Sequence, residues 1–149
     1  MTLKQKVHQH YLHLVNDKIS LLHQVLADLK ESGSNETKST AGDKHETALA
    51  MLQIEQENKR EQLAQVIAQK IIVEKINPMI VAAIVVSGSL VKTDKGYLFM
   101  SVALGKAVVE GITLTALSPQ SPLGKLLMGL KATDTAIINN KSYYIEAIE

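Results

Sequence analysis

The chain has 149 residues, 46% of them hydrophobic, and a formal net charge of +1. This length suits one full domain or two small ones, and the balanced charge excludes a protein that binds polyanions with its whole surface, so any nucleic-acid contact requires a local basic patch. Because the sequence contains no Cys, disulfides, thiolate zinc sites and cysteine nucleophiles are excluded as well.

Residues 2–31 are predicted to form one helix. Thr2 and Gln5 have the spacing of a capping box, in which each side chain binds a backbone N–H group of the first turn. Apolar residues then recur at the alternating steps of a coiled-coil heptad seam; they are Leu12, Val15, Ile19, Leu22, Leu26 and Leu29. Gly33 supplies the left-handed residue that commonly ends a helix.

Residues 43–76 are predicted to form a second long helix. Its apolar seam contains Leu49, Leu52, Leu63 and Val66, and polar Gln56 and Lys59 interrupt it. The short connection between the two helices favours an antiparallel hairpin over residues 1–76, with an acidic tip at residues 33–47. The heptad seam of the first helix is also compatible with self-association between chains, as in a coiled-coil adaptor.

The polarity pattern changes after Pro78. Strands are predicted at residues 80–91, 97–102, 112–117, 135–138 and 143–148, with turn signals at residues 94–96 and 139–141. Between the third and fourth runs, Ser121 is a good helix N-cap and Pro122 a good first helical residue. Residues 77–149 therefore predict a small antiparallel sheet with one short helix, and the whole chain an α+β protein.

No stretch of the sequence predicts a membrane span or an export signal. The longest apolar run, MIVAAIVV at residues 79–86, is shorter than the roughly 20 residues that a membrane-spanning helix needs. The first residues carry polar and His side chains where a signal peptide has an apolar core. We therefore expect a cytoplasmic protein with no membrane partner.

Two carboxylates near the predicted tip, Asp43 and Glu46, are the strongest candidates for chemistry. Their spacing suits an N-cap and its N3 partner at the start of the second helix. It also suits half of a Mg²⁺ site, since Mg²⁺ usually takes only one or two protein carboxylates and leaves its other positions to water or phosphate. Both roles are compatible, because a carboxylate has several lone-pair directions.

Positive charges on the second helix form a weaker candidate site. Charges such as those of Lys59, Arg60, Lys70 and Lys75 usually belong to a solvated face. A small patch of this kind also suits contact with a phosphate backbone, and Lys59 and Arg60 are the candidates for contact with RNA. His8, His10 and His13 favour a surface cluster. The sequence contains neither a phosphate-binding glycine loop nor the ordered nucleophile, base and acid of a hydrolase.

Two motifs and their order resemble a known family. GDKHET at residues 42–47 resembles the tip motif G-D-x-x-E-N, and SPQSPLGKLLMGLKATD at residues 118–134 is similar to S-P-x-[ST]-P-[IL]-[GA]-[KR]-x-[LM]-x-G-[KR]. Together with a helical hairpin followed by a small sheet domain, they make the chain resemble the Gre transcript-cleavage factors of bacterial RNA polymerase. The resemblance covers essentially the whole chain.

The resemblance implies a partner and a mechanism. The C-terminal half would have an FK506-binding-protein-like fold and dock on RNA polymerase, with Ser118, Pro119, Ser121 and Pro122 as partner-binding residues. The hairpin would enter the secondary channel, where Asp43 and Glu46 would share a Mg²⁺ with the polymerase at the 3′ end of backtracked RNA. The polymerase would be the catalyst, and this chain would need neither a tightly bound cofactor nor a small-molecule substrate.

The tip departs from the family pattern in three ways. Thr47 stands where Asn is usual, the tip is lengthened by SNETKSTA, and Lys38 and Lys44 place positive charge beside the carboxylates, with Glu36 as a compensating acid. Three functions therefore remain open: a factor that stimulates transcript cleavage, a channel-occupying regulator without that activity, and a coiled-coil adaptor unrelated to transcription.

Overall fold

The structure, a computed structural model, describes residues 1–37 and 43–149, apart from the side chains of residues 35–37 and 43–45. The chain divides into two compact units: a helical unit, Leu14–Lys70, and a sheet unit, Met1–His13 with Ile71–Glu149. Helices α1 (Leu3–Thr37) and α2 (Asp43–Lys75) contribute residues to both. The first turns of α1 and the last turn of α2 thus belong to the same unit as the sheet.

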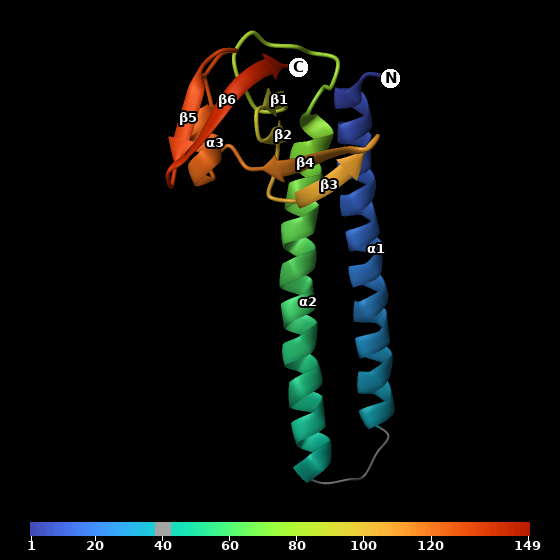
Figure 1. Ribbon diagram of the computed structural model, residues 1–149. Helices are drawn as coiled ribbons and strands as arrows, with labels where there is room; N and C mark the ends of the chain where they lie inside the picture. Colours follow the sequence, from blue (N-terminus) through green and yellow to red (C-terminus); the bar gives the residue numbers. More distant parts are fainter. Residues whose placement is uncertain (38–42) are drawn as a thin grey trace. The chain divides into compact units, whose positions relative to one another are not determined.

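In the helical unit, α1 and α2 lie side by side and run antiparallel (Figure 1). One cavity between them is lined by Lys18 and Leu22 of α1 and by Gln65 and Gln69 of α2. A second cavity has Lys30, further along α1, beside residues that lie earlier in α2. Rising residue numbers on one helix therefore meet falling numbers on the other. The predicted hairpin within one chain is confirmed.

The predicted seam forms the contact face of both helices. In α1 of the helical unit Val15 is fully buried, and the later seam residues are half-buried. Polar Gln56 and Lys59 of α2 are half-buried like the apolar seam residues around them. The seam is therefore continuous in space although polar residues interrupt its apolar character, because heptad spacing sets which side chains face the partner helix.

The helix ends follow the predictions at two places and depart at a third. At the start of α1, Gln5 Oε1 accepts from the Thr2 backbone N–H at 2.7 Å, and Thr2 Oγ1 accepts from the Gln5 N–H at 3.2 Å, which confirms the capping box. The second helix begins at Asp43 as predicted. The predicted stop at Gly33 is wrong, because α1 continues through it to Thr37: Gly33 is absent from the described glycines with positive φ, the conformation that a glycine stop requires.

None of the helices in the described part of the chain has the length and apolar character needed to cross a membrane.

The sheet unit contains six strands in the order β3-β4-β2-β1-β6-β5. They are β1 (Leu90–Thr93), β2 (Gly96–Met100), β3 (Gly105–Val109), β4 (Ile112–Leu117), β5 (Thr135–Ile138) and β6 (Lys141–Ile148). Strands β2 and β4 pair in parallel, and the other neighbours pair antiparallel. The α+β class is confirmed, but the expectation of a purely antiparallel sheet is wrong. Strand β3 lies between β2 and β4 in the chain, so the chain reverses direction before and after β3 and β4 runs parallel to β2.

The strand predictions fail in two segments. Only the end of the predicted strand at residues 80–91 is β1, and the earlier part is irregular apart from a bridge between Ile84 and Lys131. In this earlier part Val85 is fully buried, whereas Ile80 and Val81 are 63% and 66% exposed. Strand β3 was not predicted. It is followed by a turn at Glu110 and Gly111, whose φ values of 53° and 74° are typical of a tight hairpin turn.

The two faces of the sheet bury different side chains. One face carries the main core, which includes α3 (Pro122–Leu127) and consists of Val85, Val91, Leu98, Met100, Leu117, Leu127, Ala136 and Ile145. On β2, alternation turns Phe99 to the opposite face. There its ring stacks on Tyr11 of α1 with centroids 5.9 Å apart, and the Tyr11 hydroxyl donates to the Gly105 carbonyl at 2.9 Å. Tyr11 therefore fastens the start of α1 to the sheet.

Replacing Tyr11 with Phe is expected to lower the free energy of unfolding by about 1 kcal/mol, because the part-buried hydrogen bond from the Tyr11 hydroxyl to the Gly105 carbonyl is lost. Burial raises the pKa of Tyr11 from 10.0 to about 12, against a smaller lowering by the Ala116 backbone. A raised pKa in the folded state means that this stabilisation is complete below pH 10 and is lost as the pH rises towards 12.

The measurement is denaturant unfolding across the alkaline range, with Tyr144→Phe as the control because Tyr144 is exposed. Wild type is expected to lose stability above pH 10 more steeply than Tyr11→Phe. Equal pH dependence of these two proteins contradicts the assignment.

Candidate functional site

The structure describes only part of the predicted acidic tip. Asp43 is the first residue of α2, and its side chain lies outside the described residues, as do the side chains of Glu36 and Lys44 and the whole of Lys38. Glu46, about one turn further along α2, is exposed. Among the described residues there is no group of three metal-ligating side chains. The tip residues that the structure describes thus offer one accessible carboxylate.

The two cations predicted to contact RNA have different surroundings. The Lys59 ammonium lies 3.7 Å from the carboxylate of Glu55, one turn earlier in α2, and belongs to the helix contact face. Arg60 is exposed and lines a cavity of about 460 Å³ together with Lys30 and Gln56. The helical unit therefore brings Arg60 together with Lys30. The heptad spacing predicted that the two helices pack against each other. Which α1 residues lie opposite Arg60 depends on the length of the connection between the helices.

The predicted partner-binding segment forms a tight turn before α3. The Ser118 carbonyl accepts from the Ser121 backbone N–H at 3.0 Å and from the Ser121 hydroxyl at 2.6 Å. Ser121 Oγ in turn accepts from the Gly124 N–H at 3.0 Å, which confirms the predicted N-cap. Both serine side chains are thus engaged by the local backbone, because Ser118 Oγ also accepts from the Gln120 N–H at 3.1 Å.

Different residues of this region are accessible to a partner. Pro122 and Lys125 are exposed, whereas Ser118, Pro119 and Ser121 are half-buried. Leu126 and Met128 are 44% and 37% exposed, beside a fully buried Leu127. We name Pro122, Lys125, Leu126 and Met128 the α3 patch. Sequence reasoning missed its two apolar members because Leu126 has the same apolar character as its buried neighbour.

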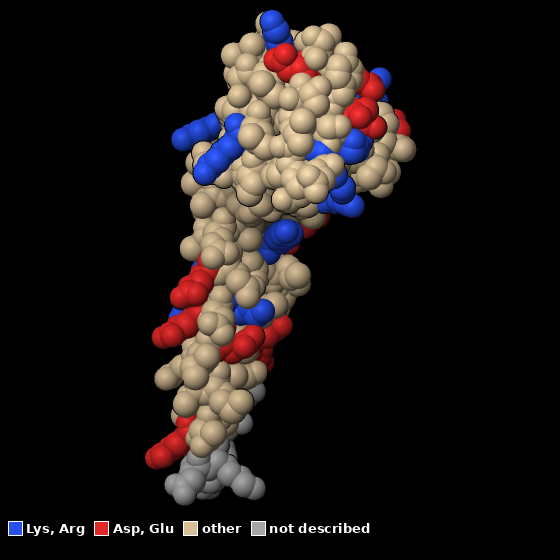
Figure 2. All heavy atoms as spheres, turned by 60° about the vertical axis from the view of Figure 1, so that its left-hand side comes forward, with Lys and Arg blue, Asp and Glu red and all other residues tan. Residues whose placement is uncertain are grey.

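Charged side chains of both signs are interspersed over the face of the sheet unit shown in Figure 2. The sheet unit contains ion pairs in which Lys6 lies 3.3 Å from Glu110 and Lys92 lies 3.9 Å from Glu146. This mixed surface favours contacts with a partner that offers both charges and apolar groups over binding to a uniform polyanion.

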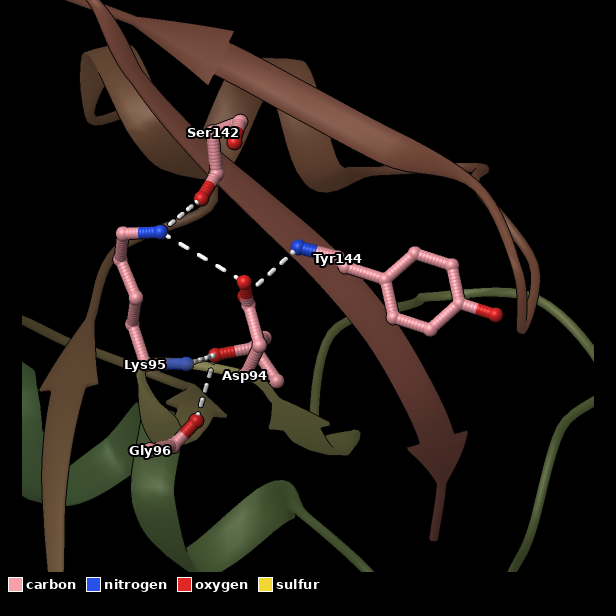
Figure 3. Close-up of polar contacts among 6 residues, drawn as sticks. Asp94, Lys95, Gly96, Ser142 and Tyr144 are labelled. Atoms are coloured by element: carbon pink, nitrogen blue, oxygen red, sulfur yellow. Dashed lines mark hydrogen bonds and ion pairs between the residues drawn. The ribbon is translucent and has the colours of Figure 1, made fainter.

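A well-defined polar cluster anchors the β1–β2 turn to β6 (Figure 3). Asp94 Oδ1 accepts from the Tyr144 N–H at 2.9 Å, and Asp94 Oδ2 lies 3.5 Å from the Lys95 ammonium. That ammonium also donates to the Ser142 carbonyl and lies 5.6 Å from the centroid of the Tyr143 ring. These contacts join neighbouring strands of one sheet, so the cluster has a structural role.

Replacing Asp94 with Asn is expected to destabilise the protein at neutral pH and to have little effect in acid. The hydrogen bond from the Tyr144 backbone, with a smaller contribution from the Lys95 ammonium, holds the pKa of the Asp94 carboxyl below its ordinary value of 3.8. With a lowered folded-state pKa, the stabilisation is present above 3.8 and is lost as the pH falls through the folded-state value.

The measurement is the difference in melting temperature between wild type and Asp94→Asn at about pH 7 and about pH 2, with Asp17→Asn, at an exposed position of α1, as the control. A difference that stays constant between these two pH values would show that the Asp94 carboxylate makes no pH-dependent contribution.

Comparisons with known proteins add little to this description. The chain matches no model of a known protein family and no curated protein. Among solved structures it is similar to the crystal structure of the GreA factor homolog 1 protein of Thermus thermophilus, with 17% sequence identity, a TM-score of 0.34, and coverage of 88% of this chain and 94% of that chain. A TM-score this low assigns neither fold family nor function, so the FK506-binding-protein-like fold stays a prediction.

Proposed function

We propose that this protein binds bacterial RNA polymerase and stimulates cleavage of backtracked RNA by lending carboxylates to a Mg²⁺ ion that it shares with the polymerase. The proposal is supported by the position of two acidic residues in the first turns of α2, within an antiparallel helix pair. Asp43 begins α2, and Glu46 is exposed about one turn later. The sequence motifs at residues 42–47 and 118–134 support the same function.

The donor set suits a shared ion. Hard carboxylate oxygens are the ligands that Mg²⁺ prefers, and one or two of them leave room for water and phosphate oxygens. When bound, the ion would supply electrostatic stabilisation and an activated water at the phosphodiester. Asp43 and Glu46 would contribute ligands, while the polymerase would hold the RNA and the remaining coordination positions. A half-site of this kind has little affinity for a cation by itself.

The α3 patch is the proposed docking surface on the sheet unit. It combines an exposed cation, Lys125, with the apolar side chains of Leu126 and Met128. An apolar centre with a charged rim is a common composition of protein interfaces. The serines of the motif would act indirectly, because Ser118 and Ser121 build the turn from which α3 begins.

The experiment is a binding measurement between purified RNA polymerase and the full chain, followed by an assay of RNA shortening in stalled, backtracked complexes. We expect binding to be weakened at least about tenfold by Leu126→Asp. The matched control is Ile137→Asp on β5, which changes another exposed apolar residue of the same unit. Equal effects of the two substitutions, or no binding by wild type, would refute the docking surface.

A regulator without cleavage activity is the second candidate, and Lys38 and Lys44 beside the acids favour it. Two positive charges near the carboxylates oppose cation binding. Polymerase binding that inhibits transcription without shortening the RNA would select this function over the first. Stable dimerisation without polymerase binding would instead select the adaptor.

A further inference from the structure

A second candidate binding site lies within the sheet unit, on the side where the end of α2 meets the irregular segment before β1. It is an open crevice of about 400 Å³, within the size range of small-molecule sites. Its lining residues are Lys4, Ile72, Lys75, Ile76, Asn77, Ile80, Val86, Ser87 and Gly88. We name it the lysine crevice. Its walls are mainly aliphatic, and Ile72 and Ile80 are 44% and 63% exposed.

Both charged residues of the lysine crevice are cations. Lys4 is only 4% exposed, and its ammonium donates to the Ile80 carbonyl at 2.6 Å. Burial lowers the pKa of Lys4, and the charge of Glu149, in a neighbouring cavity, partly opposes this. Lys75 is exposed at the end of α2, and among the described residues it has no ion-pair partner. None of the described residues that line the crevice is acidic.

This combination selects one class of ligand. An uncharged apolar molecule would desolvate the exposed Lys75 ammonium without pairing it, which costs free energy. A small inorganic anion would leave the exposed isoleucines in water. We infer that the lysine crevice binds a small amphipathic carboxylate, with its carboxylate at Lys75, the exposed cation, and its short aliphatic tail against Ile72, Ile80 and Val86.

The test uses octanoate below its micelle concentration, added to the full chain with labelled methyl groups and followed by NMR. We expect saturable shifts of the methyl signals of Ile72, Ile80 and Val86. Acetate, which has the head group without the tail, is expected to leave these signals unchanged. 1-Octanol, which has the tail without the charge, is expected to bind at least about tenfold more weakly, because its neutral hydroxyl cannot form an ion pair with the ammonium.

A pair of matched variants tests the cation. Lys75→Gln is expected to weaken octanoate binding about tenfold, while Lys106→Gln, at an exposed position on β3, leaves it unchanged. Melting temperatures show whether each variant is folded. Shifts confined to Met79 and Val81 of the neighbouring cavity, equal binding of octanol and octanoate, or equal effects of the two substitutions would each overturn the inference. RNA polymerase plays no part in this test, so it is independent of the proposed function.

Discussion

Replacing Gly124 with Ala is expected to lower the free energy of unfolding of the sheet unit by about 3 kcal/mol, because the added methyl group has no space. A Cβ atom at this position would lie 2.0 Å from the Ser118 carbonyl oxygen, 2.8 Å from Ser121 Oγ and 3.0 Å from Pro119 Cα. Two of these atoms belong to the backbone, and the Ser118 carbonyl accepts two hydrogen bonds from Ser121. Relieving the clash requires the whole turn to open.

Gly33→Ala is the matched control for this substitution. A Cβ at Gly33 would meet nothing within 4 Å, and Gly33 lies inside α1, so Ala is expected to stabilise the protein by up to about 1 kcal/mol. Denaturant unfolding gives both values, and amide exchange at Leu127 and Ile145 shows whether the loss lies in the sheet unit. If the two substitutions changed the free energy of unfolding by the same amount in the same direction, the steric explanation would be contradicted.

The largest expected functional effect is that of Asp43→Asn combined with Glu46→Gln. If the proposed function is correct, the double variant stimulates transcript cleavage at least about a hundredfold less than wild type, because amide groups are poor ligands for a shared cation. Helix α2 is expected to form normally, since Asn caps a helix as well as Asp does. Polymerase binding is expected to stay unchanged, because neither residue belongs to the α3 patch.

The control for the tip variant is Glu61→Gln, which removes another exposed carboxylate from α2. It is expected to leave cleavage unchanged. If wild type and the double variant stimulate cleavage equally, the tip carboxylates are not the groups that hold the ion. If wild type binds polymerase and stimulates no cleavage, the non-cleaving regulator is the better description.

For the candidate site, the sequence predicted local hydrogen bonds better than it predicted the burial and long-range contacts of each side chain. The capping role of Ser121 could be predicted, because it depends on residues within one helical turn, whereas the role of Asp43 and Glu46 stays a prediction. The accessibility of Leu126 beside buried Leu127 could not be predicted, because it depends on where the sheet lies. The meeting of Lys4 with the Ile80 carbonyl joins residues 76 positions apart, and no local pattern encodes it.

The sequence by itself determined the parts of this protein that depend on local physics. The Thr2–Gln5 capping box, the heptad seam of α1 and the turn at Asn139 and Asn140, with φ values of 49° and 64°, all follow from hydrogen bonds and side-chain periods within a few residues.

Only the tertiary structure decided which extended segments pair. The run at residues 80–89 has a strand composition yet stays largely irregular, while Gly105–Val109 becomes an edge strand and β2 pairs with β4 in parallel. The physical reason is that strand pairing gains its free energy from partners distant in the chain. The apolar character of a run therefore fixes neither its burial, since Ile80 and Val81 are 63% and 66% exposed, nor its pairing. The partner that satisfies its backbone decides whether it becomes a strand.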